Sequence, residues 1–479
     1  MTDAAAGQTP LPRLTIGPGG WGRKAILVFV LAVLMAIPGL FVFALVADRT
    51  HRAQTVTQEV SALQGGAQHL LGPMLVAPYV IPPPPRPPGD TSASATPVTG
   101  WYLVSPETGS ARLTVEAASL HRGIFEVPVY DARAELVARF APPPKSLNLA
   151  NGGVVDWSQA RLVVGLSDLR GAKSDFAGEL ATAAGGGAVG FGPVSGLDLG
   201  SGGDSGGSNG GFDYATAPAA ALTSAPDGGT VKLSVRFTGA ERISVLPFAK
   251  STTVSVTSDG GSPSFDGGFL PDHRSLTGHR FSAVWNVPFI ARGLSDHGTL
   301  SALSVSALSA KDLGVTFVPA NNPYTNVGRA LKYAVMFVGL VFLTFFVFEA
   351  LSGRRLHPAQ YLMIGLAQMV FYLLLLSLSE YVGFDLAFTA AATATVALIG
   401  LYAGAAFRSR AYGGRALAIF AVVYGLIYLL MRLEDFALLA GSLATFVGLA
   451  LAMYLTRNID WYGPRPAQDA KAPPGAPGA

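Results

Sequence analysis

The chain has 479 residues, of which 50% are hydrophobic and 13% charged, and its formal net charge at pH 7 is +3. This near balance, with no concentrated basic patch, excludes nucleic acid as an expected partner. The chain has no cysteine, so thiol nucleophiles and stabilising disulfides are also excluded.

The apolar residues gather in six runs of membrane length. A run of about 20 apolar residues crosses a hydrocarbon core of roughly 30 Å. The sequence therefore predicts an α-helical polytopic membrane protein with six transmembrane helices. A large exported all-β domain, resembling a sandwich, is inserted between the first and second helices.

The chain begins with a tail, residues 1–24, that precedes a charge-free run, Ala25–Val46. This run is long for a signal sequence, and the residues before Asp48 make a poor cleavage site, which favours an uncleaved transmembrane anchor over a cleaved signal. His51–Leu70 has helical composition and no proline, and is expected to continue the anchor as a stalk.

Residues 47–329 hold no comparable apolar run and are expected to form the β-rich domain. Residues 82–99 are predicted to be a Pro-rich linker, and residues 183–229, dominated by Gly, Ser and Ala, a disordered insertion. Short segments rich in Val and aromatic residues predict the strands. They are Tyr102–Val104, Ala111–Ala117, Phe125–Val129, Glu135–Phe140, Arg161–Leu166, Val231–Thr238, Ile243–Leu246, Thr252–Thr257 and Phe281–Phe289.

Residues 330–456 are expected to form a bundle of five transmembrane helices, followed by a tail, residues 457–479. The five apolar runs are Tyr333–Phe348, Tyr361–Leu378, Leu386–Phe407, Ala416–Met431 and Phe436–Leu455. Short loops rich in Arg and Lys stay in the cytoplasm. One alternate set of tails and loops holds nearly all of these residues, which predicts that both termini are cytoplasmic and that the β-rich domain is periplasmic. The set comprises Arg13, Arg23, Lys24, Arg354, Arg355, Arg408, Arg410, Arg415, Arg457, Arg465 and Lys471.

Charged residues cluster in the opposite short turns of the bundle. These residues, a candidate outer-surface charge platform, are Glu380, Asp385, Arg432, Glu434 and Asp435. The positions of Asp385, Glu434 and Asp435 at helix N-termini are explained by capping and by the helix dipole, which favours negative charge there. The alternative is that Arg432 pairs with Glu380 or Asp385 and ties two outer turns together. Glu349, at the other side, is expected to pair locally with Arg354 or Arg355.

Small residues recur every four positions on two of the spans and form a candidate helix-packing stripe. They are Gly400 and Gly404 on one span, and Ala440, Ala444, Gly448 and Ala452 on the last. Such spacing lets helix backbones approach closely. It is explained by packing within the bundle, while homo-oligomerisation is the alternative.

No motif in the chain carries catalytic or cofactor chemistry. Gly17–Lys24 lacks the Gly-Lys-Ser/Thr ending of a phosphate loop. Asp272, His273 and His279 lie in a turn-rich loop, where nothing in their spacing aims them at one metal ion. We therefore expect no enzyme activity, no metal and no cofactor.

Eight sequence segments, in this order and in this membrane layout, resemble the CreD family of bacterial inner-membrane proteins. They are LGPMLVAPY at Leu71–Tyr79, HRGIFEVPVYDA at His121–Ala132, WSQARLVVGLSDLRG at Trp157–Gly171, GSPSFDGGFLPDHR at Gly261–Arg274, HPAQYLMIGLA at His357–Ala367, LLLSLSEYVGFDLAF at Leu374–Phe388, LEDFALLAGS at Leu433–Ser442 and TRNIDWYG at Thr456–Gly463. The resemblance implies a role in cell-envelope integrity and the response to envelope stress. It brings no catalytic residue with it.

The expected function is therefore that of a non-enzymatic inner-membrane protein that supports the envelope through its periplasmic domain. Its expected partners are the lipid bilayer and either envelope proteins or cell-wall components. The alternatives are a transporter or lipid-handling protein that uses the five-helix bundle, and an accessory or sensor subunit of a membrane complex. A polar path through the bundle would favour the transporter, and one stoichiometric partner would favour the subunit.

Overall fold

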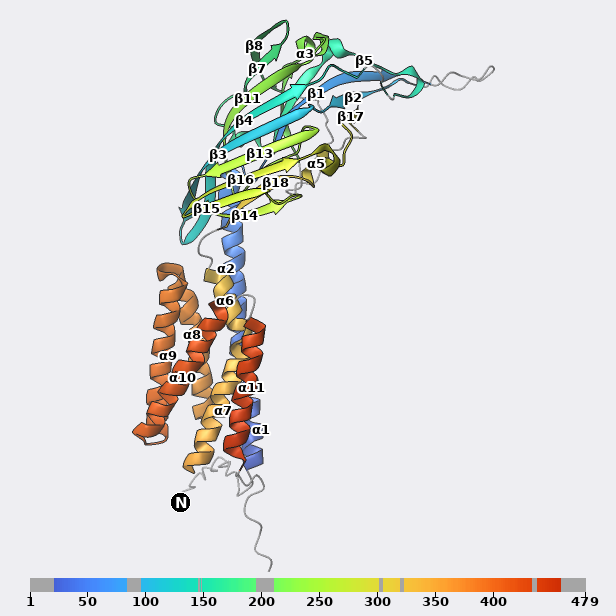
Figure 1. Cartoon of the computed structure of the whole chain (residues 1–479). Coiled ribbons are helices and arrows are strands. Elements are labelled where there is room, and N and C mark those ends of the chain that lie inside the picture. Colours follow the sequence, from blue (N-terminus) through green and yellow to red (C-terminus); the bar gives the residue numbers. More distant parts are fainter. Residues whose placement is uncertain are drawn as a thin grey trace, which may run out of the picture. The chain divides into compact units, whose positions relative to one another are not determined.

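The computed structural model describes residues 21–83, 96–144, 147, 149–194, 211–300, 305–318, 323–432 and 437–457 (Figure 1). The chain divides into two compact units. A helical unit comprises Met1–His51 and Asn321–Ala479, and a β unit comprises Arg52–Ala320.

The helical unit is built from long apolar helices. Five helical stretches are long and apolar enough to cross a membrane, and the last helix contributes a shorter apolar stretch, Gly441–Tyr454. The chain therefore has the helices of a multi-pass membrane protein. The helices are α1 (Trp21–Leu34), α2 (Ala36–Leu63), α6 (Pro323–Lys332), α7 (Ala334–Ser352), α8 (Pro358–Val382), α9 (Phe384–Ala406), α10 (Arg410–Arg432) and α11 (Ala437–Thr456).

In the first apolar run, one narrow face of α1 and α2 is buried against the rest of the structure. Val28, Met35, Val42 and Val46 are buried at intervals of seven, seven and four residues, which keeps them on one helix face. Most other apolar side chains of these two helices are exposed, as side chains that face lipid would be. The predicted stalk is helical but ends at Leu63, because Gln68 already starts the first strand.

The β unit contains two sheets. One has ten strands with the central order β14-β18-β12-β1-β6-β10-β9, and the other has eight in the order β15-β16-β13-β3-β4-β11-β7-β8. The strands are β1 (Gln68–Ile81), β2 (Val98–Val104), β3 (Thr108–Arg122), β4 (Phe125–Phe140), β5 (Val154–Val155), β6 (Arg161–Leu166), β7 (Ala177–Thr182), β8 (Gly185–Gly190), β9 (Gly192–Pro193), β10 (Asp213–Pro218), β11 (Gly229–Ala240), β12 (Arg242–Val245), β13 (Ser251–Ser258), β14 (Ser262–Gly267), β15 (His273–Thr277), β16 (Arg280–Val287), β17 (His297–Thr299) and β18 (Leu313–Val318).

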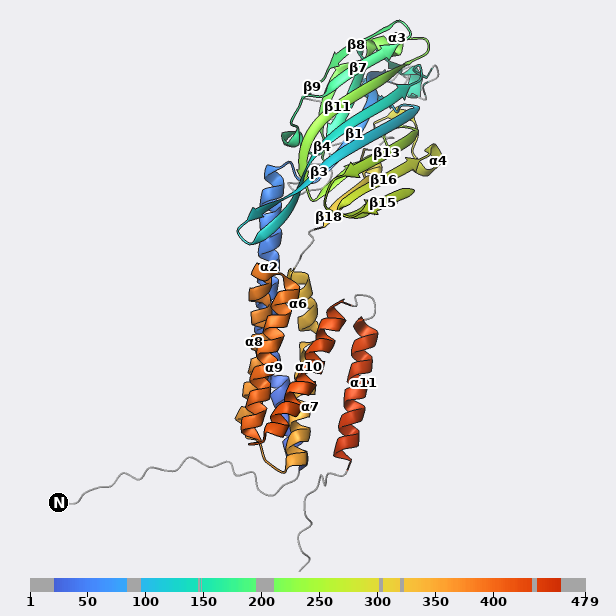
Figure 2. The ribbon, with the colours of Figure 1, turned by 60° about the vertical axis from the view of Figure 1, so that its left-hand side comes forward.

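Alternation of apolar and polar residues explains these strands. In β4, every second residue from Ala132 to Phe140 is buried while its neighbours are exposed, so one face of the strand meets the core. One hydrophobic core contains residues of both sheets, including Leu75 of β1 and Leu136 of β4. The predicted β-rich domain is confirmed. The predicted segments Phe125–Val129 and Glu135–Phe140 belong to the single strand β4, which forms a long hairpin with β3 (Figure 2).

The expectation of a disordered insertion over residues 183–229 is wrong for the part that the structure describes. Gly185–Gly190 pairs with β7, and Asp213–Pro218 pairs with β6. Sheet pairing uses backbone groups, so a strand poor in side chains can still join an edge. A short helix, α3 (Ala220–Ser224), follows and buries Leu222, while residues 195–210 lie outside the described residues.

The Pro-rich linker was expected over residues 82–99, but Val98 and Thr99 already belong to β2, where they pair with Ile81 and Val80 of β1. Residues 84–95 lie outside the described residues.

Candidate functional site

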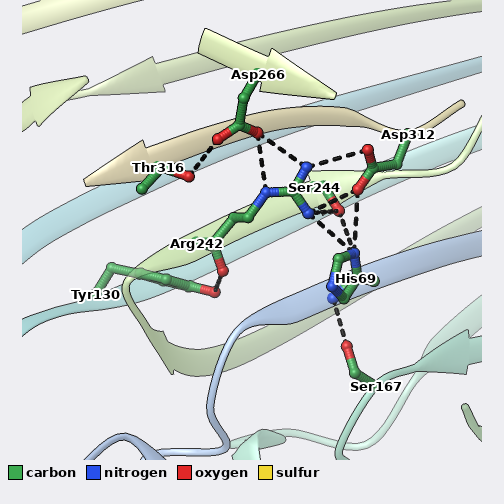
Figure 3. A network of polar contacts seen from close by, with 8 residues as sticks. All are labelled: His69, Tyr130, Ser167, Arg242, Ser244, Asp266, Asp312 and Thr316. Atoms are coloured by element: carbon green, nitrogen blue, oxygen red, sulfur yellow. Dashed lines mark hydrogen bonds and ion pairs between the residues drawn. The ribbon is translucent and has the colours of Figure 1, made fainter. Parts of the chain in front are cut away.

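A network of polar side chains joins four strands of the ten-stranded sheet (Figure 3). Arg242 of β12 lies at its centre. Its Nη1 and Nη2 donate to the two carboxylate oxygens of Asp312 at 2.7 and 3.0 Å, and its Nε donates to Asp266 Oδ1 at 2.9 Å. Thr316 of β18 donates to the second oxygen of Asp266. A planar guanidinium matches a carboxylate in this two-point geometry, so the network fixes Arg242 between two acids.

The strand order brings these residues together. Asp266 lies on β14, Asp312 precedes β18, and Arg242 lies on β12, the next strand along. Gly314 of β18 leaves the space that the guanidinium needs, because a Cβ at this position would lie 2.4 Å from both Arg242 Nη2 and Asp266 Oδ1. The glycine is therefore required for close approach and not for a turn.

His69 of β1 completes the network from the other side of β12. Its Nδ1 lies 2.7 Å from Ser244 Oγ and 3.2 Å from Asp312 Oδ2. A Ser-His-Asp relay needs the serine and the aspartate on different ring nitrogens. Here both contact the same nitrogen, so this arrangement cannot relay a proton from Ser244 to Asp312.

Charge pairing sets the protonation of the network. Burial alone would raise the pKa of Asp312, but hydrogen bonds from His69, Arg242 and Ser244 and the charge of Arg242 outweigh it and lower the pKa. Burial would lower the pKa of Arg242, and its bonds to Asp312 and Asp266 raise it instead. Asp312 is therefore an ionised, nearly buried carboxylate at neutral pH.

The network lies on the strands that follow α2 and precede α6. β1 follows α2, β18 precedes α6, and both strands pair with β12. At the end of α2, Ser61 Oγ donates to Glu241 Oε1 at 2.8 Å, one residue before Arg242. Tyr130 of β4 donates to the Arg242 carbonyl oxygen at 2.7 Å. The network thus clamps together both strands that connect to the helical unit. We call its residues His69, Arg242, Ser244, Asp266 and Asp312 the clamp.

A second feature of the β unit is an open groove of about 770 Å³. It lies beside β5, which pairs with Tyr79 and Val80 at the far end of β1. His69 and Val80 are 11 residues apart on β1, so the groove lies roughly 35 Å from the clamp along that strand. Its lining includes Pro142, Pro143, Pro144, Val154, Trp157, Thr223, Ser224 and Pro226. Val154 is 67% exposed, so part of this lining is apolar surface open to solvent.

The residues of the predicted charge platform do not form one cluster in the structure. Arg432 Nη2 lies 2.6 Å from Asp385 Oδ2, and Tyr428 donates to Asp385 Oδ1 at 3.1 Å. Glu380 pairs elsewhere: it accepts from Tyr324 at 3.2 Å and lies 3.8 Å from Arg49 Nε. The predicted pairing of Arg432 with Asp385 is present in the structure, while the one with Glu380 is not. Glu434 and Asp435 lie outside the described residues.

The small-residue stripe packs within the helical unit. A Cβ on Gly400 of α9 would lie 2.4 Å from Leu417 of α10, and a Cβ on Gly413 would lie 3.1 Å from Gly404 Cα. A Cβ on Gly448 of α11 would lie 3.0 Å from Leu340 of α7, and Ala452 is buried. These contacts match the intramolecular interpretation of the stripe. Ala440 and Ala444 also lie on α11.

At the other end of the bundle, Glu349 of α7 is fully buried. It pairs with Lys24 of α1 and accepts a hydrogen bond from Tyr361 of α8 at 3.0 Å. The expected local pairing with Arg354 or Arg355 is therefore wrong. Lys24 also donates to the Leu356 carbonyl oxygen at 2.9 Å, so it joins the first helix to α7 and to the segment before α8.

Sequence reasoning treated Lys24 only as a topology signal and missed the clamp. The only signal in the sequence for the pair of Lys24 and Glu349 was that Glu349 is an acidic residue at the end of an otherwise apolar run. The expected loop of Asp272, His273 and His279 is wrong in part, because His273 begins β15 and His279 lies in the turn between β15 and β16. No group of three metal-ligating side chains occurs among the residues that the structure describes. Asp272 instead accepts from the backbone N–H and the side chain of Asn286.

Comparisons with known proteins agree with this membrane architecture. A family model described as inner membrane protein CreD matches residues 21–462. The inner membrane protein CreD of Escherichia coli K12 is 35% identical over 233 residues, which cover 48% of this chain and 51% of that protein. The alignment thus spans about half the length of this curated relative.

Proposed function

Because the chain belongs to the CreD family of inner-membrane proteins, we propose that it supports the integrity of the bacterial cell envelope, without enzyme activity, through contacts of its β unit with a cell-wall component or envelope protein. The groove beside β5 is the observation that carries this proposal. It combines exposed apolar surface, an indole and two hydroxyl side chains, a mixture that suits recognition of a partner.

The proposed topology has six membrane spans, with α11 as the sixth, both termini in the cytoplasm and the β unit in the periplasm. The charge distribution supports it. The helices alternate in direction, so one end of the bundle collects exposed arginines, which the positive-inside rule assigns to the cytoplasm. They are Arg23, Arg354, Arg355, Arg408, Arg410, Arg415 and Arg457.

A non-enzymatic role is supported by the clamp geometry. Ser244 and Asp312 share one nitrogen of His69, and Asp312 is held at both oxygens by Arg242. These bonds organise the strands, and they do not form the Ser-His-Asp relay that activates a serine nucleophile. The clamp is therefore proposed to hold β1, β12, β14 and β18 together within the β unit.

The transporter alternative has less support. The buried polar residues within α7, α8 and α9 that the structure describes are Glu349, Gln368, Ser379 and Thr395. Glu349 is already paired with Lys24, and Ser379 and Thr395 each bond a carbonyl of their own helix. Gln368 lines a cavity of only about 10 Å³, whereas a substrate path needs polar groups along a cavity large enough for the substrate. The sensor-subunit alternative needs a stoichiometric partner, which co-purification would detect.

The groove is tested in a strain that lacks the protein and is sensitive to envelope stress. Val154→Glu places a charge on the exposed apolar lining and should abolish rescue by the plasmid-borne protein without lowering its level in the membrane. Val137→Glu on β4, which is 38% exposed and outside the groove, should rescue normally.

A photo-crosslinker at position 224 should then capture a wall component or an envelope protein. Full rescue by Val154→Glu would refute the groove as the contact site. Loss of rescue by Ser244→Ala at normal protein level and melting temperature would instead favour an enzyme.

A further inference from the structure

We propose that the helical unit holds one ordered water molecule in a small cavity between α7, α8 and α10. This cavity has a volume of about 10 Å³ and is lined by three polar side chains, Gln368, Tyr372 and Tyr424. The rest of the lining is apolar and includes Phe337 and Ile427. The inference concerns the bundle and does not rest on the function proposed for the β unit.

The first observation is an unpartnered acceptor. Gln368 is 3% exposed, and its Oε1 has no hydrogen-bond partner in the protein. A buried amide oxygen without a partner is unfavourable, and native proteins satisfy such groups with protein donors or ordered water. The occupant of the cavity must therefore donate a hydrogen bond to Gln368.

The second observation is the arrangement of the other two polar groups. Gln368 and Tyr372 are four residues apart on α8 and lie on one helix face. Tyr424 comes from α10, whose packing against α8 is fixed by the ring of Phe371 at 4.8 Å between centroids. Both tyrosines line the same cavity as Gln368, and in the proposal their phenol groups supply further partners for the water, within the two to four that an internal water needs.

Size and charge select the occupant. A water needs roughly 10–15 Å³ of accessible space, so the cavity accommodates one and nothing larger. None of the residues that line it carries a charge, so a desolvated ion would lack a counter-charge there. The water would bridge α8 and α10 by hydrogen bonds inside the bundle.

The test uses the full-length protein in lipid bilayers, deuterated except for glutamine side-chain amides and isoleucine δ1 methyl groups. Solid-state NMR measures the transfer of polarisation from water to each site. Ile427 lines the cavity, whereas Ile364 is equally buried, at 2% exposure, but lies outside it. Transfer to Ile427 and to the Gln368 amide should be several-fold faster than transfer to Ile364.

Two variants make the result specific. Gln368→Leu removes the acceptor and should reduce transfer at Ile427 to the rate at Ile364. Tyr372→Phe keeps the aromatic ring but removes the hydroxyl group that would bond the water, and should reduce the transfer rate at Ile427 in part. Equal rates at Ile427 and Ile364 in the unmodified protein would refute the water. So would an Ile427 rate that neither variant changes.

Discussion

At the residue scale, the clamp shows how a few side chains can organise a sheet. Arg242 contacts acids from two neighbouring strand segments, and Gly314 is the residue whose missing side chain leaves it room. Each partner is satisfied by the others, so the cost of removing these groups from water is offset by charge-assisted bonds. Loss of one member should therefore destabilise the remaining ones.

Asp312 gives this idea a pH dependence. Its pKa is lower in the folded state than the ordinary value near 4, so its ionised form contributes stability above about pH 4, and this contribution is lost as the pH falls further. Asp312→Asn should lower the melting temperature of the β unit at neutral pH, and the difference from the unmodified protein should shrink on acidification.

Melting is followed by tryptophan fluorescence, to which Trp285, buried in the core of the β unit, contributes. Asp175→Asn, at an exposed position, serves as the matched control and should leave the melting temperature nearly unchanged. A difference for Asp312→Asn that stays constant from pH 7 to below pH 4 would show that its charge is not the source of the stability.

At the scale of the elements, the first helix is part of the bundle and more than a tether. It contributes a buried seam to the packing and the cation that neutralises Glu349. The contact of Lys24 with Glu349 helps to hold α1 against α7, although most of the surface of α1 is exposed.

Lys24→Met should therefore destabilise the bundle strongly, by about 3–5 kcal/mol, because it leaves a buried carboxylate unpaired. Glu349→Gln in the same chain should restore most of the loss, since the charge that needed a partner is gone. The measurement is the thermal stability of the full-length protein in detergent, read by size-exclusion chromatography.

Arg23→Met removes the neighbouring but exposed cation and should have little effect. If Lys24→Met behaves like Arg23→Met, or if Glu349→Gln brings no recovery, the ion pair does not stabilise the bundle.

At the scale of the whole molecule, the chain passes between the helical unit and the β unit at two places, within α2 and between β18 and α6. In the proposed topology both connections lie on the same face of the membrane, because no membrane span lies between them in the sequence. The β unit must then lie entirely on one side.

Reporter fusions test this topology. A reporter that is active only in the periplasm should be active when fused after Ser201 and silent when fused after Gly463. The reason is that α11 returns the chain to the arginine-rich side. Activity after Gly463 would mean that α11 does not span the membrane and that the bundle has one crossing fewer. Silence after Ser201, with a stable fusion protein, would contradict the export of the β unit.

The sequence alone determined the class of this protein, because apolar runs and strand alternation are local patterns that burial imposes on neighbouring residues. It therefore located the membrane helices, eight of the strands (β2, β3, β4, β6, β11, β12, β13 and β16) and Gly400 and Gly404 as a packing surface. It also narrowed the partner of Arg432 to Glu380 or Asp385, between which only the structure could choose.

Only the tertiary structure decided the contacts between distant segments. Lys24 and Glu349 are 325 residues apart and Arg242 and Asp312 are 70 apart, and no local pattern links such pairs. The Gly-rich strand β8 was missed for the opposite reason: its own residues predict coil, and backbone pairing with β7 makes it a strand.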